Sequence, residues 1–400
     1  MQDTIFWIAA GIVIPSAVGS LACVVLFLAK LRIPISRPVA DIVLLLPATG
    51  SLDNLENLLA ALGRQSVRAG RLIIAVESPD DPAYRRATEL AKTHREPAID
   101  VVVANVSNRR GQKCTNILAA LTRLTADDRF VVMLDADICP QSWWLGALVA
   151  PLATGDADLV NGHRWLVPKP PTLASVLVAH IDRALAVLPR LAPAGIVWGG
   201  SLALTRETVE ILDLARTIDR EVVEDAPIGG RVAETGLRLL TRRALRVPTP
   251  LRGSWRELWS FGRRQGQFVR LYRPRLWCCA SLIATADFLA RVVLAWHLLA
   301  EGSPPALRVL ALVAALGSVA TEFRRAVGRR IGVADGLVCT TYQHLLTWAI
   351  LPIGAWYISL IWASAFTSVV RWAHVQYSLD RSGRVLAAQR HPYGPRRRGV

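Results

Sequence analysis

The stretch FVVMLDAD, residues 130–137, joins five apolar residues to two aspartates that flank an alanine. A continuous apolar run of this length is typical of a parallel strand that is buried on both faces. Asp135 and Asp137 follow the run directly, so we expect them at the end of the strand, where ligands bind on open α/β sheets. Because alternate residues of an extended chain face the same side, the two carboxylates would point together.

Three similar apolar runs precede this stretch, and segments with apolar residues at helical spacing separate them. The runs occupy residues 41–47, 71–77 and 99–104, and the helical segments occupy 52–64, 82–95 and 111–124. Strands that alternate with helices in this order form a parallel sheet covered by helices. The sequence therefore predicts an open α/β sheet of the nucleotide-binding type.

The pattern becomes mixed in residues 142–247. Here the sequence predicts a strand at 157–161 and helices at 172–188 and 225–235, with the glycine-rich WGGS at 198–201 between the two helices. Ligands on open sheets collect beyond the ends of strands, so we expect this half of the domain to build the acceptor side of a site.

The N-terminal region contains no charged residue between Asp3 and Lys30. A helix of this length exceeds the roughly 30 Å hydrocarbon core of a bilayer, so we predict a transmembrane helix. A signal peptide would carry positive charge before a shorter apolar run, whereas Lys30, Arg32 and Arg37 follow this one. By the positive-inside rule, the N-terminus lies outside and the next domain lies in the cytosol.

Further apolar segments follow Pro274, and they predict four more transmembrane helices. They occupy residues 276–300, 306–321, 333–351 and 353–370. Asp287 and Arg291 interrupt the first segment at i and i+4, and we expect them to pair. The basic segment 323–330 and the arginine-rich tail 371–398 are expected in the cytosol. We therefore predict a multi-pass protein of five spans in a bacterial inner membrane.

The chain has 400 residues, a net charge of +16 and 52% hydrophobic residues, with a mean hydropathy of +0.34. Charged residues still make up 20%, so the apolar residues must be segregated into membrane and soluble parts. Most basic residues flank apolar segments, where they set topology and attract anionic lipids. No recognition module accompanies them, and we expect no nucleic-acid partner. The six cysteines form no CxxC pair, which argues against structural zinc and a disulfide framework.

These patterns divide the chain into five parts that differ in composition. The parts are an N-terminal transmembrane anchor (1–37), a cytosolic α/β domain (38–250), an interfacial segment (251–275), C-terminal transmembrane helices (276–370) and a basic cytosolic tail (371–400). The interfacial segment interleaves aromatic residues with arginine, as segments at a membrane surface do. Within it, Gln267 and Arg270 are candidates for contacting a diphosphate, and lipid-headgroup anchoring is the alternative for its arginines.

Several polar residues are candidates for binding a nucleotide and a metal. Asp135 and Asp137 can coordinate Mg²⁺ or Mn²⁺, which neutralises a departing diphosphate, and a solvated turn is the alternative. Glu77 ends the second predicted strand, where acidic residues often bind the sugar of a nucleotide, and a turn motif is its alternative. Lys113 is a candidate for contacting phosphate or supporting the metal-site carboxylates, and otherwise a surface lysine.

Glu224 and Asp225 open a predicted helix in the acceptor half of the domain. A carboxylate in this place can take the proton from an attacking hydroxyl group. The alternative is that these acids only stabilise the N-terminus of the helix through its dipole.

Taken together and in this order, these residues resemble family 2 type glycosyltransferases, most closely the ceramide glucosyltransferase group. The resemblance covers roughly residues 40–275. The matching elements are Glu77, the stretch from Gly111 to Asn116, Asp135-Ala136-Asp137, Gly199-Gly200-Ser201, Glu224-Asp225 and the stretch from Gln267 to Leu271. There are two departures, because Leu271 stands where the QxxRW element has tryptophan and Glu77 stands where an aspartate is common.

The resemblance implies a GT-A fold, the α/β fold of nucleotide-diphospho-sugar transferases, with an N-terminal transmembrane helix and C-terminal transmembrane helices. It implies a nucleotide sugar donor, a divalent metal cofactor, a membrane lipid acceptor and contact with the bilayer. The implied roles are nucleotide-sugar binding for Glu77, Asp135, Gln267 and Arg270, metal binding for Asp135 and Asp137, general base for Asp225, and acceptor-side positions for His163 and Glu224.

These expectations combine into an inverting, metal-dependent enzyme that transfers a single sugar from UDP-glucose or a similar donor to the hydroxyl of a lipid such as ceramide. A hopanoid, a polyprenyl phosphate or a growing polysaccharide are alternative acceptors. Leu271 and the short membrane portion favour single transfer over processive synthesis. A membrane transporter or scaffold is the alternative of another class, and it would use the polar residues Asp287, Arg291 and His344 within the apolar segments.

Overall fold

The computed structural model describes residues 2–35, 37–189 and 195–393, and the chain forms two compact units. The α/β unit comprises Arg32–Arg164, Arg190–Thr249 and Ser368–Val400, and the helical unit comprises Met1–Leu31, Trp165–Pro189 and Pro250–Thr367. Each unit therefore combines segments that lie far apart in the sequence.

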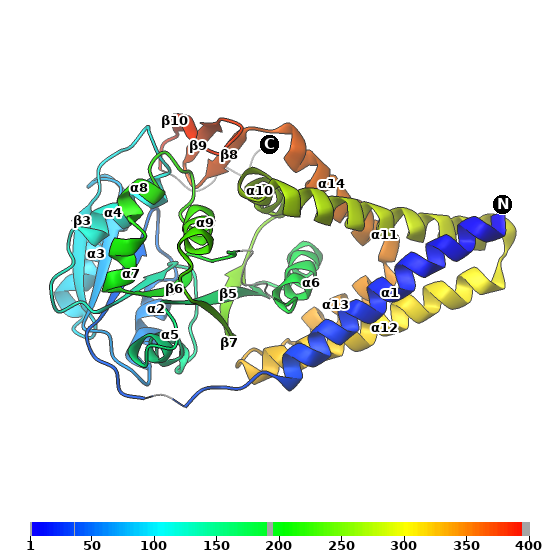
Figure 1. Cartoon of the computed structure of the whole chain (residues 1–400), viewed down its shortest axis with the longest axis horizontal. Helices are drawn as coiled ribbons and strands as arrows, with labels where there is room; N and C mark the ends of the chain where they lie inside the picture. Colours follow the sequence, from blue (N-terminus) through cyan, green and yellow to red (C-terminus); the bar gives the residue numbers. More distant parts are fainter. Residues whose placement is uncertain (1, 36, 190–194, 394–400) are drawn as a thin grey trace. The chain divides into compact units, whose positions relative to one another are not determined.

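The centre of the α/β unit is a seven-stranded sheet with the strand order β3-β2-β1-β4-β6-β5-β7. Its strands are β1 (Ile42–Pro47), β2 (Arg71–Val76), β3 (Ala98–Val103), β4 (Phe130–Leu134), β5 (Leu159–Pro168), β6 (Ser201–Thr205) and β7 (Leu239–Leu251). Strands β3, β5, β6 and β7 of this sheet are labelled in Figure 1. The first four strands are parallel, whereas β6 pairs antiparallel with β4 and with β5. The prediction of four parallel strands is confirmed.

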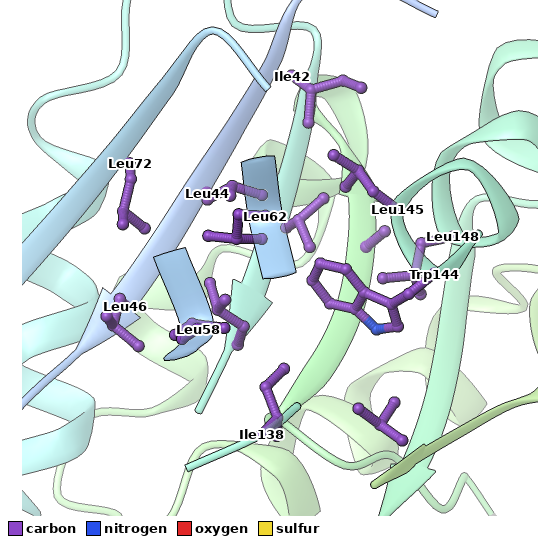
Figure 2. Packing of buried hydrophobic residues seen from close by; sticks show 14 of the residues in the cluster. Ile42, Leu44, Leu46, Leu58, Leu62, Leu72, Ile138, Trp144, Leu145 and Leu148 are labelled. Atoms are coloured by element: carbon purple, nitrogen blue, oxygen red, sulfur yellow. The ribbon is translucent and has the colours of Figure 1, made fainter. Parts of the chain in front are cut away.

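Helices cover both faces of the sheet at its centre, and this explains why β1 and β4 are apolar throughout. The helices are α2 (Leu55–Gly63), α3 (Pro82–Thr93), α4 (Gln112–Leu121), α5 (Trp144–Ala153), α7 (Arg206–Ile211), α8 (Leu214–Thr217) and α9 (Asp225–Thr235). Leu44 and Leu46 of β1 pack in one core with Leu58 of α2 and Trp144 of α5 (Figure 2). Val43, on the opposite face of the same strand, enters a second core with α4 and α9. Full burial stabilises the fold by about 1.5–3 kcal/mol for each such leucine or valine.

The tail, which we expected only as a basic cytosolic segment, folds as a second sheet of the α/β unit. Its three antiparallel strands are β8 (Val369–Trp372), β9 (Val375–Leu379) and β10 (Val385–Arg390). Val375, Tyr377 and Leu379 of β9 are buried, and the residues between them are partly exposed. This period of two is the pattern of a strand with one buried face. We call these three strands the C-terminal sheet.

Within the described residues, the helical unit has three single helices long and apolar enough to cross a membrane. They are α1 (Gln2–Ala29), α11 (Pro274–Glu301) and α12 (Pro304–Arg330). Phe6 of α1, Leu294 of α11 and Val313 of α12 belong to one buried cluster, so the three helices pack together. Asp287 and Arg291 of α11 pair as expected, with Nε and Oδ2 2.7 Å apart.

The region predicted to form spans at 333–351 and 353–370 has a different structure. It consists of α13 (Leu337–Trp348) and α14 (Ile350–Ala363), which have 12 and 14 residues and are bent by 89° at the break between them. A helix needs about 20 residues to cross a bilayer, so the prediction of two spans here is wrong. Pro352 lies in the first turn of α14 and has no N–H for the preceding turn, which explains why α13 does not continue.

The helical unit also contains α6 (Leu173–Ala186) and α10 (Trp255–Tyr272). Arg183 of α6 forms a buried ion pair with Asp335, with Nη1 and Oδ2 2.7 Å apart. Loss of either partner would leave an uncompensated buried charge, so this pair fixes α6 within the unit. The basic segment 323–330, predicted to separate two spans, is instead the last part of α12.

Candidate active site

Asp135 and Asp137 follow β4 at the carboxyl end of the parallel strands, as the sequence predicts. The loop that contains them is held from two sides. Asp135 N donates a hydrogen bond to Gly200 O at 3.4 Å, and Asn54 Nδ2, just before α2, donates to Ala136 O at 3.2 Å. The position of both carboxylates is therefore set by the sheet and by its neighbouring loops.

Lys113, in the first turn of α4, joins two acidic residues that are distant in the sequence. Its Nζ lies 2.7 Å from Asp135 Oδ1 and 2.7 Å from Glu224 Oε1. The lysine side chain is 14% exposed and the Glu224 side chain only 1%. Burial lowers the pKa of Lys113, but the two carboxylates raise it more, and the net pKa lies above its usual range. Lys113 is thus a charged member of the site and not a solvated surface lysine.

Two glycines of the WGGS stretch, Gly199 and Gly200, allow Glu224 and Asp135 to approach this stretch closely. A Cβ atom at Gly199 would overlap the Glu224 carboxylate, and one at Gly200 would overlap Asp135 Oδ2 and the Trp198 ring. The absence of side chains at these two positions therefore makes the cluster possible. The sequence contains the glycines, but it does not show which residues approach them.

Asp225 is the first residue of α9, and its Oδ1 accepts a hydrogen bond from Ala226 N at 2.7 Å. Burial, followed by the charge of Glu224, raises the pKa of Asp225 to about 7, although Lys113 opposes this shift. A carboxyl group with a pKa near neutrality is suited to accept a proton during a reaction. The Glu224 side chain does not cap α9, because it is directed to Lys113.

Asp137 is solvent-exposed, yet its carboxyl group is crowded by protein atoms. This crowding and the charge of Asp135 raise the pKa of Asp137 to about 6. A bound cation would offset the repulsion between the two carboxylates. The part of the chain that the structure describes has no group of three or more His, Cys, Asp or Glu side chains that could hold a metal. An ion here would need further oxygens from a substrate, which is how Mg²⁺ is usually held beside phosphates.

The structure directs Glu77 toward the C-terminal sheet. Its side chain is 1% exposed, and the side chains of Arg390 and His374 both reach it. The same sheet also reaches Lys113, because the ring centroid of Trp372 lies 5.6 Å from its Nζ. Residues 371–400 were predicted as a basic cytosolic tail, and this prediction gave Trp372, His374 and Arg390 no role near Glu77 or Lys113. The alternation of apolar and polar residues in β9 is the signal that indicates a strand there.

The candidates Gln267 and Arg270 belong to α10 of the helical unit. Gln267 Nε2 and Arg270 Nη2 both donate hydrogen bonds to Thr367 O, at 3.1 and 2.8 Å. Trp259 of the same helix donates from Nε1 to Ser359 Oγ at 3.0 Å. These polar groups stabilise the helical unit internally, and contact with a diphosphate stays a prediction.

His163 lies in β5 of the α/β unit, in the acceptor half of the fold. Its ring is 6.1 Å from the ring of Trp198, in an edge-to-face arrangement. Trp198 directly precedes the two glycines that contact Glu224 and Asp135, so His163 neighbours the same loop. Its role toward an acceptor is untested and stays a prediction.

A parallel sheet with paired aspartates after β4, and a second acidic pair at the start of α9, is a suitable arrangement for binding a nucleotide sugar at the carboxyl end of an open α/β sheet. Residues 10–385 match the family described as Glycosyl transferase family 21, and the chain belongs to this family. The resemblance to the ceramide glucosyltransferase group is thereby confirmed at the level of the family. No curated protein sequence matches the chain.

Two of the solved structures that are similar to the chain have low sequence identity to it. One is the mannosyltransferase PcManGT from Pyrobaculum calidifontis in complex with GDP-Man and Mn²⁺, which is 20% identical. The match has a TM-score of 0.50 and covers 90% of this chain and 99% of that chain. Another is glucosyl-3-phosphoglycerate synthase from Mycobacterium tuberculosis, 17% identical, with a TM-score of 0.36 and coverage of 58% and 79%. The GT-A fold predicted for this chain is confirmed.

Proposed function

We propose that the protein transfers one sugar from a nucleotide sugar, such as UDP-glucose, to a hydroxyl group of a membrane lipid such as ceramide, with inversion at the anomeric carbon. The supporting observation is the cluster in which Lys113 joins Asp135 to Glu224, next to Asp225 with its pKa near 7. This cluster combines a place for a charged donor with a group that can accept a proton.

The donor would bind at Asp135 and Asp137. A divalent metal bound there, Mg²⁺ or Mn²⁺, would neutralise the negative charge that develops on the departing diphosphate. Lys113 holds Asp135 in place through its ion pair. The PcManGT structure contains Mn²⁺ together with GDP-Man, which supports a metal of this type in a site of the same fold.

Asp225 would be the general base. At neutral pH a large share of its carboxyl groups is ionised, because its pKa is about 7, and it can remove the proton from the acceptor hydroxyl. The oxygen then attacks the anomeric carbon as the nucleoside diphosphate leaves. A single displacement of this kind inverts the configuration, and it needs no covalent sugar intermediate on the protein.

A lipid acceptor is supported by the helical unit. Its three apolar helices are long enough to cross a membrane, and α10 carries exposed aromatic and arginine side chains such as Trp255 and Arg256. Such a composition is typical of helices that lie at the membrane surface. The hydroxyl group of a lipid acceptor lies in the headgroup region, which is the level of the membrane surface at which a helix such as α10 would lie.

The test is to incubate membranes that contain the protein with labelled UDP-glucose, UDP-galactose and UDP-GlcNAc and to separate the products. We expect a lipid that carries one labelled sugar, and no such product with Asp225→Asn. Long polymers would support a processive synthase, and labelled hopanoid or polyprenyl phosphate would change the acceptor. Absence of any transfer by the unaltered protein would support a transporter or scaffold instead.

Removal of divalent cations tests the metal. We expect a chelator to abolish transfer and added Mn²⁺ or Mg²⁺ to restore it, because two carboxylates alone cannot neutralise a diphosphate. In Asp137→Asn we expect a higher metal concentration for half-maximal activity. Full activity in the chelator would contradict the metal assignment.

A further inference from the structure

Glu77 is a buried carboxylate whose two oxygens both face cations or potential cations of the C-terminal sheet. Arg390 Nε donates a hydrogen bond to Oε1, and His374 Nε2 lies 2.9 Å from Oε2. Burial raises the pKa of Glu77, but His374 and Arg390 lower it more, so the net pKa is below its usual value. The ionised carboxylate is therefore neutralised by the protein itself and is 1% exposed.

All three guanidinium nitrogens of Arg390 donate hydrogen bonds around Glu77. Besides Glu77, Arg390 donates to Asn108 Oδ1 at 2.8 Å, to Ser107 O at 2.8 Å and to Gln112 Oε1 at 2.9 Å. A planar guanidinium with four such acceptors has one orientation. The end of β10 is thus fixed against the loop after β3 and against the start of α4.

The C-terminal sheet makes two further contacts with the start of α4. Gln112 N, one of the backbone donors that a helix leaves unpaired in its first turn, donates to Tyr377 Oη at 2.9 Å. The next residue is Lys113, whose Nζ lies 5.6 Å from the ring centroid of Trp372, within the range of cation–π attraction. The sheet therefore reaches the lysine that joins Asp135 to Glu224.

We infer that Glu77 is a positioning residue that anchors the C-terminal sheet, and that this sheet acts on the donor site through Trp372 and Lys113. On this inference Glu77 does not contact the nucleotide itself, and the last strands of the chain form part of the donor site. The effect of the sheet on the donor site rests on the proposed function. The anchoring of the sheet by Glu77 does not.

The test is a double-mutant cycle in the purified full chain with Glu77→Gln, Arg390→Gln and the double variant. Hydrogen exchange at residues 375–379 reports the docking of the sheet and needs no substrate. The Michaelis constant for the nucleotide sugar and kcat report the donor site. We expect each single variant to lose protection in β9 and to raise KM about tenfold, with the double variant no worse than either, because contacting residues are not additive.

Two results would overturn the inference. In one, Glu77→Gln raises KM while β9 stays protected, and the effects of Glu77→Gln and Arg390→Gln on KM multiply in the double variant. This result is expected of a residue that contacts the nucleotide directly. In the other, β9 loses protection while KM is unchanged, so that the sheet has no influence on the donor site. Arg381→Gln is the matched control, because it removes an exposed arginine from the same tail and should change neither quantity.

Trp372 supplies a second test that does not disturb Glu77. Trp372→Ala should raise KM for the donor with β9 still protected, and Trp372→Phe should restore much of the affinity because it keeps an aromatic face toward Lys113. Equal KM values in the unaltered protein, Trp372→Ala and Trp372→Phe would refute the proposed link between the C-terminal sheet and the donor site. If the unaltered protein neither binds nor transfers a nucleotide sugar, the proposed function and the effect on the donor fall together, and hydrogen exchange still decides the anchoring.

Discussion

At the scale of single residues, Lys113 is the side chain on which the arrangement of the site depends. It places one positive charge between Asp135 and Glu224, which would otherwise repel each other and Asp225. Glu224 has an almost fully buried carboxylate, so its charge needs a partner in the folded protein. The same lysine lies beside Trp372 of the C-terminal sheet. Its removal should therefore affect stability and donor binding together.

We predict that Lys113→Met destabilises the protein by about 3–5 kcal/mol, the usual cost of leaving one partner of a buried pair uncompensated. Thermal unfolding of the purified protein, with and without nucleotide, measures this effect. Lys92→Met is the control, because Lys92 is exposed near the end of α3 and should leave the unfolding temperature almost unchanged. Equal unfolding temperatures for the two variants would show that the Lys113 ion pairs do not stabilise the fold.

The pKa of Asp225 predicts how activity depends on pH. A general base acts in its ionised form, so kcat/KM should rise with pH through about 7 and then level. Asp225→Asn should lower the rate by about 10²- to 10⁴-fold and abolish this rise. Glu234→Gln changes an exposed acid at the other end of α9 and should keep the profile of the unaltered protein. A rise of the same shape in Asp225→Asn would assign it to another group.

The sequence could predict where the acids stand along the chain, but not what they contact. Asp135 and Asp137 follow an apolar run, and this order alone locates them at a strand end. The ion pair between Lys113 and Glu224 joins α4 to the segment before α9, and nothing in either segment indicates the other. Glu77 shows the same limit, because its partners Arg390 and His374 lie in the tail at the far end of the sequence.

At the scale of elements, the central strands were predictable because burial on both faces makes them apolar throughout. The C-terminal sheet was not predicted, since its short strands carry arginines and resemble a solvated basic tail. The WGGS loop is an intermediate case. Its glycines indicate an unusual backbone or a close approach, and the structure shows a close approach to Glu224 and Asp135.

Gly200→Ala tests that close approach. The added Cβ atom would overlap Asp135 Oδ2 and the ring of Trp198, so the metal-site loop must shift. We expect a loss of stability of about 1–3 kcal/mol, as for other overpacked sites, and a large loss of kcat. Gly63→Ala is the matched control, because no atom beyond its chain neighbours and its own helix backbone lies within 4 Å of the added methyl group. Unchanged kcat in Gly200→Ala would mean that the loop tolerates displacement of Asp135.

At the scale of the whole molecule, the path of the chain restricts its membrane topology. The α/β unit contains the segment that ends at Thr249 and also the C-terminal sheet that begins after Thr367, so a membrane would have both on the same side. The chain between them must then cross an even number of times. Helices α11 and α12 are long and apolar enough to supply two crossings. Hydropathy alone predicted an incorrect number of spans because it does not register the break before α14.

We therefore predict that α13 and α14 form a re-entrant hairpin that enters and leaves the membrane on the side of the α/β unit. Their 12 and 14 residues extend only about 18 and 21 Å, too short for two crossings of a core about 30 Å thick. The side of the membrane on which a position is accessible can be measured by labelling single cysteines with an impermeant maleimide. The six native cysteines are first removed. Ser303→Cys, between α11 and α12, should react from the side opposite to the α/β unit, and Lys30→Cys from the same side as that unit. Ala349→Cys, at the bend, should resist labelling from the opposite side, and strong labelling there would show that the hairpin crosses the bilayer.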